Sequence, residues 1–334
     1  MEQPPNDRPT LRSLAEITGL AVSTVSQALR DSPEISEETR RRVKLAAQQA
    51  GYRPNRAGVR LRTGKTNVIT VVLNPQDDGS NFFANFVYGI SEGLAGTPYH
   101  LVVTPYSLSD PMAPVRYIVE TGSADGVIMS RTQPSDPRAR YLTDNNMPFA
   151  THGRTAMGLA HPYYDFDNEE FAYEALRQLA LRGRKRIALL GPPRELTYHI
   201  HTNLGFERGL RDFGLIGVPL NSVDIDATLP VVRQLGFDLA HQAVSPDGFV
   251  VSGVTAAVAL TMGFQDAGLE IGKDFDLATK DLPSLLNMFS PKLISIPEDF
   301  SAAGRELAKA IVRYIGGDRG EELCMLVKPV VAAV

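Results

Sequence analysis

The sequence predicts a small all-α helix-turn-helix headpiece, followed by an α/β body made of two doubly wound parallel-sheet lobes. Residues 10–29 contain two short amphipathic helical patterns joined by a tight turn at Gly19. From residue 67 onward, short apolar runs alternate with amphipathic helical patterns, which is typical of parallel sheets covered by helices on both faces. At 334 residues the chain is too long for one hydrophobic core, so it suits several domains.

The first helix is expected to begin after Thr10, whose hydroxyl can accept a hydrogen bond from a first-turn backbone N–H. Leu11 and Leu14 belong to its apolar face, and Gly19 ends it. This short helix fits the element of a helix-turn-helix that crosses the DNA backbone.

The second helix is expected from Val22 to about Arg30, with Val25, Ala28 and Leu29 facing the core. That spacing leaves other side chains pointing outward, namely Val22, Ser23, Ser26 and Gln27. Glutamine can bond adenine through two groups, serine both donates and accepts, and valine can touch a thymine methyl. We therefore expect this helix to read bases in the major groove.

A third helix is expected from Glu37 to about Gln49, capped by Ser36. The segment Tyr52–Thr66 that follows is basic, with a single apolar residue, Leu61. Such a segment suits a minor-groove wedge that orders only on DNA.

The charge distribution agrees with a DNA-binding headpiece. Residues 1–65 hold 12 Lys and Arg against 7 Asp and Glu, whereas the remainder holds 22 against 31. Phosphate neutralisation needs cations only where the duplex is touched, although a net charge of this size also occurs on ordinary solvated surfaces.

The single cysteine, Cys324, lies in an apolar run where a buried thiol is expected, and it cannot form an intramolecular disulfide. With neither a signal-peptide pattern nor a long apolar run, a cytoplasmic protein is expected.

At this point the run from Thr10 to Thr66 closely resembles the headpiece of the LacI/GalR family of transcriptional repressors. The shared motifs are the turn, the TVS core, SEETRRRV, GYRPN and LRTGKT, in order. The resemblance implies a homodimer that reads a pseudo-palindromic operator, with Val22, Ser23 and Gln27 at base-reading positions and Leu61 at the intercalating hinge position. Together with the residue pattern, it gives a DNA-binding set: Thr10, Val22, Ser23, Thr24, Ser26, Gln27, Arg30, Tyr52, Asn55, Arg56 and Leu61. Gln27 stands where the family usually has Arg, and Ala21 stands where it usually has a capping Ser.

In the body, strands are expected at VITVVL, HLVVT, DGVIMS, PFATH, YYDF, RIALL, GFVVS, FDLAT and LISI. Helices are expected at about 82–94, 168–182, 254–267 and 300–315, with another ending near Phe213. The motifs SNFFANFVYGI, GFERGL and DFDNEEFAYEALRQLALRGRKRIALLG resemble the periplasmic-binding-protein-like effector domain of the same family. That resemblance implies two lobes with a ligand cleft between them.

The expected organisation is a headpiece at 1–52, a hinge helix and linker at 53–66, and an effector-binding and dimerisation core at 67–334. Within the core, the first lobe is expected at about 67–164 plus 293–323. The second lobe is expected at about 165–292 plus the C-terminal strand in 324–334. Three crossings between the lobes would allow hinge closure around a ligand.

Parallel sheets bind ligands beyond the carboxyl ends of their strands, so residues at these ends are candidates for the cleft. They are Asn74, Asp77, Phe82, Phe83, Ser130, Arg131, His152, Arg154, Asp165, His199, Thr202, Gly253 and Asp281. Carboxylates and amides can bind sugar hydroxyls, and aromatic faces can stack on a pyranose. Compared with the family, Thr202 replaces a common Arg and Gly253-Val254 replaces Asn-Asp, whereas Asp281 matches the family's ligand-binding acid.

No enzyme, cofactor or metal is expected. Gly64-Lys65-Thr66 resembles the end of a phosphate-binding loop, but Val59 occupies the position of the required glycine and a strand follows the motif instead of preceding it. His199-x-His201 on a strand-like or loop segment lacks the further ligands of a metal site.

The sequence thus favours a ligand-responsive repressor of a carbohydrate uptake or catabolic operon. Two alternatives remain open. One is a purine-type co-repressed or phosphoprotein-partnered regulator, and the other is a sugar-binding protein or enzyme with an idle headpiece.

Overall fold

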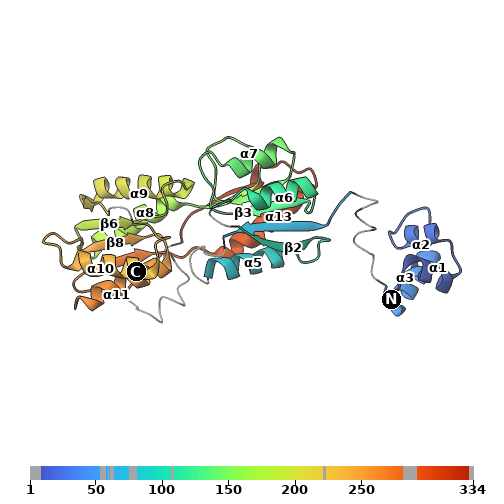
Figure 1. Ribbon diagram of the computed structural model, residues 1–334, viewed down its shortest axis with the longest axis horizontal. Coiled ribbons are helices and arrows are strands. Elements are labelled where there is room, and N and C mark those ends of the chain that lie inside the picture. Colours follow the sequence, from blue (N-terminus) through green and yellow to red (C-terminus); the bar gives the residue numbers. More distant parts are fainter. Residues whose placement is uncertain are drawn as a thin grey trace. The chain divides into compact units, whose positions relative to one another are not determined.

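A computed structural model describes residues 9–52, 58, 60, 64–74, 81–106, 109–220, 223–280 and 292–330. The chain divides into two compact units, Met1–Thr66 and Asn67–Val334, and each is described by itself (Figure 1).

The first unit contains three helices, α1 (Leu11–Thr18), α2 (Val22–Ala28) and α3 (Glu37–Gln49). Their caps follow the sequence pattern. Thr10 Oγ1 accepts a 3.2 Å hydrogen bond from Ser13 N, Gly19 takes the left-handed conformation that ends α1, and Ser36 caps α3. A small core of Leu14, Val25, Ala28, Val43 and Ala47 holds the three helices together, as the apolar spacing predicts.

The first lobe of the second unit is built on a six-stranded parallel sheet in the order β11-β5-β4-β3-β1-β2. Its strands are β1 (Val68–Leu73), β2 (His100–Pro105), β3 (Gly126–Met129), β4 (Phe149–His152), β5 (Tyr163–Phe166) and β11 (Cys324–Val327). Side chains alternate across β1. Ile69, Val71 and Leu73 pack with α5 (Asn81–Leu94) and α13 (Phe300–Ile315), whereas Val72 packs with α6 (Ala113–Thr121) and α7 (Pro137–Asp144). The sheet is therefore covered on both faces (Figure 1).

The second lobe has a five-stranded parallel sheet in the order β10-β9-β8-β6-β7. Its strands are β6 (Arg186–Leu190), β7 (Ile216–Val218), β8 (Gly248–Val251), β9 (Asp276–Thr279) and β10 (Ile294–Ser295). One face packs against α8 (Asn168–Leu181) and α9 (Thr197–Phe213), and the other packs against α10 (Leu229–Ala240) and α11 (Val254–Asp266). The predicted fold class, a helical headpiece followed by two parallel α/β lobes, is confirmed.

Glycines allow the covering helices to approach closely. A Cβ at Gly304 of α13 would lie 2.3 Å from the backbone oxygen of Phe86 in α5. A Cβ at Gly205 of α9 would lie 1.9 Å from the backbone oxygen of Glu169 in α8. Both contacts involve backbone atoms, so a side chain at either position would push the two helices apart.

The structure corrects several expectations. The C-terminal strand was expected in the second lobe, but β11 pairs with β5 at the edge of the first sheet, so the crossing expected before Cys324 is wrong. The edge strand β10 lies in the 293–323 segment, which was expected in the first lobe. It belongs to the second sheet, since it pairs with β9. Both are short edge strands, whose patterns do not identify the sheet they join.

Further differences concern exposure and short elements. Cys324 is exposed, not buried, because an edge strand leaves one side uncovered. The elements α6, α7, α10 and β7 were not expected from the sequence. Helices α6, α7 and α10 each begin at or near a proline. Because proline is common in turns and loops, these segments resembled loops in the sequence.

Candidate functional site

The residues predicted to read DNA lie on α2 and the turn after it. Val22 is 44% exposed and Ser23 and Arg30 are exposed, whereas Thr24, Ser26 and Gln27 are half-buried. Gln27 Nε2 donates a 3.3 Å hydrogen bond to Glu34 Oε2, and Arg30 Nε donates one of 2.9 Å to Ser26 O. The amide of Gln27 is therefore held by a carboxylate of the same unit.

Other headpiece residues have structural partners. The Thr10 hydroxyl caps α1, and Tyr52 is half-buried against the headpiece core. Ala21 provides no side-chain cap at the N-terminus of α2. This is expected, because alanine stands where the family usually has a capping serine. Asn55, Arg56 and Leu61 lie outside the described residues, so the hinge prediction is not addressed by the structure.

In the second unit, a cleft opens where the carboxyl ends of strands from both sheets meet, and it encloses about 890 Å³ counting the solvent at its mouth. The side chains that line it come from both lobes and from the crossovers: Phe82, Ser130, Arg131, Thr132, His152, Gly153, Asp165, Phe166, Asn168, Tyr198, Ile225, Asp226, Ser252, Val254, Lys280, Glu298 and Phe300. A ligand pocket in this position is typical of parallel α/β folds.

The structure brings together Phe82, Ser130, Arg131, His152 and Asp165 of the predicted set at this cleft. The other described residues of the predicted set are not among those that line it, namely Asn74, Phe83, Arg154, His199, Thr202 and Gly253. Thr202 is buried on α9 and its hydroxyl donates to Tyr198 O, and His199 Nδ1 lies 2.8 Å from Pro192 O. Asp77 and Asp281 lie outside the described residues.

The floor of the cleft is a buried polar chain that joins the lobes. His152 Nε2 at the end of β4 lies 3.4 Å from Glu298 Oε1, and Glu298 Oε2 lies 3.1 Å from Lys280 Nζ at the end of β9. Lys280 Nζ also donates to Asn168 Oδ1. Burial alone would raise the pKa of Glu298, but Lys280 and His152 outweigh burial and lower it to about 2. Glu298 is therefore a carboxylate at neutral pH.

A second buried carboxyl lies at the end of β5. Asp165 is 2% exposed and accepts a 2.6 Å hydrogen bond from Arg154 Nε. Burial raises the pKa of Asp165 above its usual value, and the positive charge of Arg154, which lowers it, only partly offsets this effect. His201 Nδ1 lies 3.9 Å from the same carboxyl, and burial lowers the pKa of this histidine.

Aromatic rings form one wall of the cleft. The rings of Phe82 and Phe300 meet edge to face with centroids 5.1 Å apart, and Phe82 lies 5.5 Å from the ring of His152. Lys280 Nζ lies 5.5 Å from the ring centroid of Tyr198 on α9. Such rings offer an apolar face beside the polar floor.

Three polar atoms of the cleft are buried without a hydrogen-bond partner among the described residues. They are Ser130 Oγ after β3, Ser252 Oγ after β8 and, at hydrogen-bond distance, His152 Nε2 at the end of β4, whose ion-pair partner Glu298 Oε1 lies 3.4 Å away. Of these three atoms, only the two serine hydroxyls therefore lack any polar partner among the described residues. An unpaired buried polar group is costly, so such atoms in a cleft indicate where ligand groups bind.

Several lining residues were missed from the sequence. Ser252 and Lys280 directly follow β8 and β9, but the residue after each of them was chosen instead. Asp226 and Glu298 lie in connections without a regular pattern, so no sequence signal identified them. Phe300 is the first residue of α13, inside the predicted 300–315 helix, but it was not chosen as a cleft residue. The pair His199 and His201 lies on α9 and not on a strand or loop. Within the described ranges no group of three or more His, Cys, Asp and Glu could hold a metal ion. In the same ranges, none of the helices has the length and apolar character that a membrane crossing requires.

Comparison with known proteins gives matches along nearly the whole chain. Residues 10–55 match the family profile of bacterial regulatory proteins of the lacI family, and residues 176–332 match that of a periplasmic binding protein-like domain. The HTH-type transcriptional regulator AglR of Rhizobium meliloti is 33% identical over 92% of this chain and 87% of its own. The HTH-type transcriptional regulator RafR of Escherichia coli is 30% identical over 96% of both chains.

Solved structures share the fold. A transcriptional regulator CelR–cellobiose complex superposes with a TM-score of 0.69 and 22% identity, covering 98% of this chain and 99% of that one. The lac repressor dimer bound to operator and the anti-inducer ONPF gives a TM-score of 0.82 with 18% identity, covering 96% and 97%.

Proposed function

Because the chain belongs to the LacI family of bacterial transcriptional regulators, we propose that it represses a carbohydrate uptake or catabolism operon. In this proposal a homodimer binds a pseudo-palindromic operator in the cytoplasm. An uncharged, sugar-like effector in the cleft controls that binding. The relatives named above are transcriptional regulators and not enzymes.

The observation that carries the effector proposal is the set of unpartnered polar atoms on opposite sides of the cleft. Ser130 Oγ belongs to the first lobe and Ser252 Oγ to the second, and neither has a hydrogen-bond partner among the described residues. Each hydroxyl can both donate and accept, which matches the hydroxyl groups of a sugar. The Phe82 and Phe300 rings offer an apolar surface for the C–H face of a pyranose.

The charges of the cleft favour an uncharged effector. Of the residues that the structure describes in its wall, the two cations are each paired with a carboxylate, Arg131 with Asp226 and Lys280 with Glu298. A phosphate or carboxylate ligand would have to compete with these carboxylates for the cations. A neutral polyol meets no such competition.

The names of similar proteins support the same class of effector. One similar structure is a regulator bound to cellobiose, a neutral disaccharide.

For the DNA side, we assign base reading to α2, chiefly to Val22, Ser23 and Gln27. Thr24, Ser26 and Arg30 are assigned to the same surface. Leu61 is assigned to a minor-groove wedge at the hinge. A similar fold was solved as a repressor dimer on its operator.

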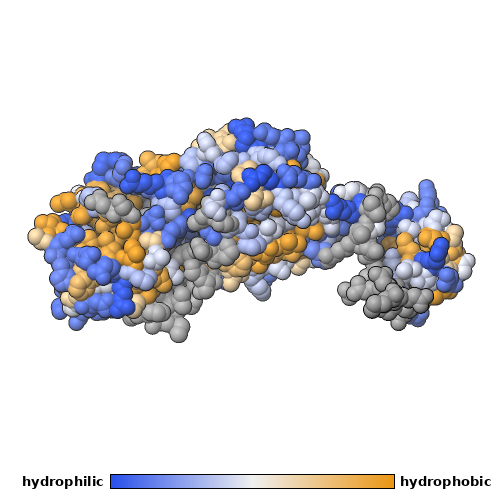
Figure 2. Space-filling model, in the orientation of Figure 1, coloured by the Kyte–Doolittle hydropathy of each residue, from blue (hydrophilic) through white to orange (hydrophobic). Residues whose placement is uncertain are grey.

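Exposed apolar residues on the first lobe support a dimer. Tyr88 on α5 is 62% exposed, and Val102 and Val103 on the edge strand β2 are 44% and 37% exposed. Figure 2 shows apolar surface in the region of α5 and β2. An apolar edge strand of this kind is a ready surface for a second copy of the chain.

A panel of neutral sugars, sugar phosphates and purines tests the effector proposal by thermal shift, because a ligand that binds the folded state raises the melting temperature. We expect a neutral sugar to stabilise the protein and Ser130→Ala with Ser252→Ala to abolish that shift. Ser245→Ala, in the second lobe outside the cleft wall, is the matched control and retains it. A purine response would overturn the sugar proposal in favour of co-repression, and a sugar-phosphate response would contradict an uncharged effector.

A further inference from the structure

The loop after β3 reaches across the cleft in two places. Arg131 Nη1 and Nη2 donate to the two carboxylate oxygens of Asp226 at 3.2 and 2.5 Å. Asp226 lies between β7 and α10, in the second lobe. One residue further along the loop, Thr132 O accepts a 2.8 Å hydrogen bond from Thr197 N at the start of α9. Ser130–Thr132 is thus a direct bridge between the lobes.

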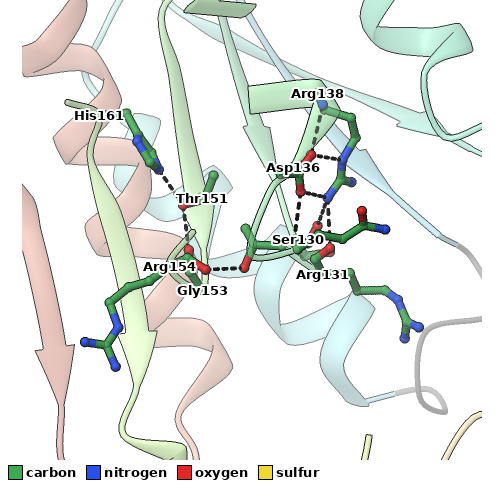
Figure 3. Close-up of polar contacts among 10 residues, drawn as sticks. Ser130, Arg131, Asp136, Arg138, Thr151, Gly153, Arg154 and His161 are labelled. Carbon is green, nitrogen blue, oxygen red and sulfur yellow. Dashed lines mark hydrogen bonds and ion pairs between the residues drawn. The ribbon is translucent and has the colours of Figure 1, made fainter. Parts of the chain in front are cut away.

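The backbone of this loop is held in an uncommon conformation. Arg131 has a φ of +54°, in the left-handed region that non-glycine residues rarely adopt. Arg138 Nη2 donates to Ser130 O at 3.0 Å and to Arg131 O at 2.8 Å, and its guanidinium pairs with Asp136 (Figure 3). Asp136 is fully buried and the Arg138 side chain is 5% exposed. A buried ion pair beneath the loop therefore fixes the position from which Arg131 extends.

The loop after β4 is hydrogen-bonded to the loop after β3. Thr132 Oγ1 donates a 2.8 Å hydrogen bond to Arg154 O. Thr151 Oγ1 donates to Gly153 O at 2.6 Å (Figure 3). Hydrogen bonds thus hold both loops of the first lobe beside Arg131.

The bridge differs from the floor of the cleft in its contact with solvent. The side chains of Arg131 and Asp226 are 12% and 30% exposed, whereas those of Lys280 and Glu298 are 8% and 5% exposed. A partly exposed ion pair can open and close with the lobes at little desolvation cost, and salt weakens it. Its bidentate geometry makes the pair sensitive to the relative orientation of the two lobes.

We propose that Arg131 and Asp226 form a latch that holds the two lobes together over the cleft. Arg138 is the positioning residue of this latch. The inference deepens the proposed function, because a latch of this kind sets how readily the lobes open and close around an effector. Any ligand then acts by its different affinity for the latched and unlatched states.

The test measures lobe separation directly, by electron–electron resonance between two spin labels on the full-length protein. The labels are attached at Glu120→Cys on α6 and Glu207→Cys on α9, with Cys324→Ser removing the native thiol. Both label sites are exposed. Labelled protein is diluted with unlabelled protein, so that distances between two copies of the chain do not contribute.

We expect Asp226→Ala to lower the ratio of the short-distance to the long-distance population by about two- to fivefold, the effect expected of an ion pair near the surface. High salt lowers this ratio in the wild type and not in the variant. Arg138→Lys, which keeps the charge but loses the planar fork that reaches both carbonyls, lowers it as well. The exchanged pair Arg131→Asp with Asp226→Arg restores it, since aspartate tolerates a positive φ.

Asp266→Ala is the matched control. It removes another bidentate arginine–aspartate pair, with Arg233, that lies entirely between α10 and α11 of the second lobe. Its distance distribution should equal that of the wild type. Identical distributions for Asp226→Ala and the wild type would overturn the latch. The measurement uses neither DNA nor sugar, so its failure would leave the proposed regulatory function untouched.

Discussion

Replacing Glu298 by glutamine removes the negative charge that neutralises buried Lys280. Glu298 and Lys280 are 5% and 8% exposed, so the lysine left behind lies in a site with little access to water. Its remaining neighbours are the Asn168 amide and the rings of Phe166, Phe171 and Tyr198. We therefore expect Glu298→Gln to destabilise the second unit strongly.

The size of the effect follows from the pKa of Glu298. Burial acting alone would raise it, but Lys280 and His152 lower it from 4.5 to about 2. Since each pKa unit corresponds to about 1.4 kcal/mol, the charged form contributes about 3 kcal/mol to stability. Breaking one partner of a buried ion pair typically costs about 3–5 kcal/mol, which agrees.

The lowered pKa of Glu298 also determines how the stability of the fold depends on pH. A carboxyl whose pKa is lower in the folded state stabilises the fold fully above pH 4.5 and loses that effect as the pH falls toward about 2. The difference between the wild type and Glu298→Gln should therefore be constant near neutral pH and shrink below pH 4.5.

Urea unfolding followed by circular dichroism is the appropriate assay, because the chain contains no tryptophan. Glu306→Gln is the control. It breaks the surface pair Glu306–Lys309, whose side chains are 34% and 52% exposed, and should cost less than about 1 kcal/mol. Lys280→Met combined with Glu298→Gln should recover most of the lost stability. A Glu298→Gln variant as stable as the wild type at pH 7 would show that the Glu298 carboxylate does not stabilise the fold.

Three further predictions concern the headpiece and the packing of helices. Gln27→Ala should relax base preference at one operator position by about 1–3 kcal/mol, measured on singly substituted operators; equal loss on all sequences would show a phosphate contact instead. Thr10→Ala should lower stability by about 1 kcal/mol through loss of the α1 cap, measured by thermal melting, with exposed Ser23→Ala as the control; equal melting of both variants would contradict the cap. Gly304→Ala should destabilise the α5–α13 contact, whereas Gly316→Ala at the end of α13 should be tolerated; urea unfolding distinguishes them, and equal midpoints would contradict the close approach.

The sequence identified most of the fold because the apolar periods are regular. The strand VITVVL is β1, and the predicted 300–315 helix is α13. The headpiece caps Thr10 and Ser36 were also identified, because capping depends on local hydrogen bonds. Strand β11 was assigned to the wrong sheet, because strand pairing depends on distant residues.

The cleft was harder to predict. The positions of the strand ends correctly predicted Ser130, His152 and Asp165 as cleft residues. At two other strand ends the prediction chose the residue after the one that lines the cleft, and so missed Ser252 and Lys280. Successive residues at a strand end point in opposite directions, and the sequence does not show which one enters the cleft. Asp226 and Glu298 contribute through connections whose paths depend on the tertiary structure. Their roles required the three-dimensional arrangement.

In the proposed function, a sugar bound in the cleft changes the affinity of the headpiece for DNA. The direct measurement is fluorescence anisotropy of the full-length protein on an operator selected from random DNA, titrated with neutral sugars at fixed salt. We expect at least one neutral sugar to change the affinity, and Ser130→Ala with Ser252→Ala to remove this response while operator binding persists. Sequence-selective DNA binding that no neutral sugar alters, or a response that survives the double variant, would contradict the proposed function.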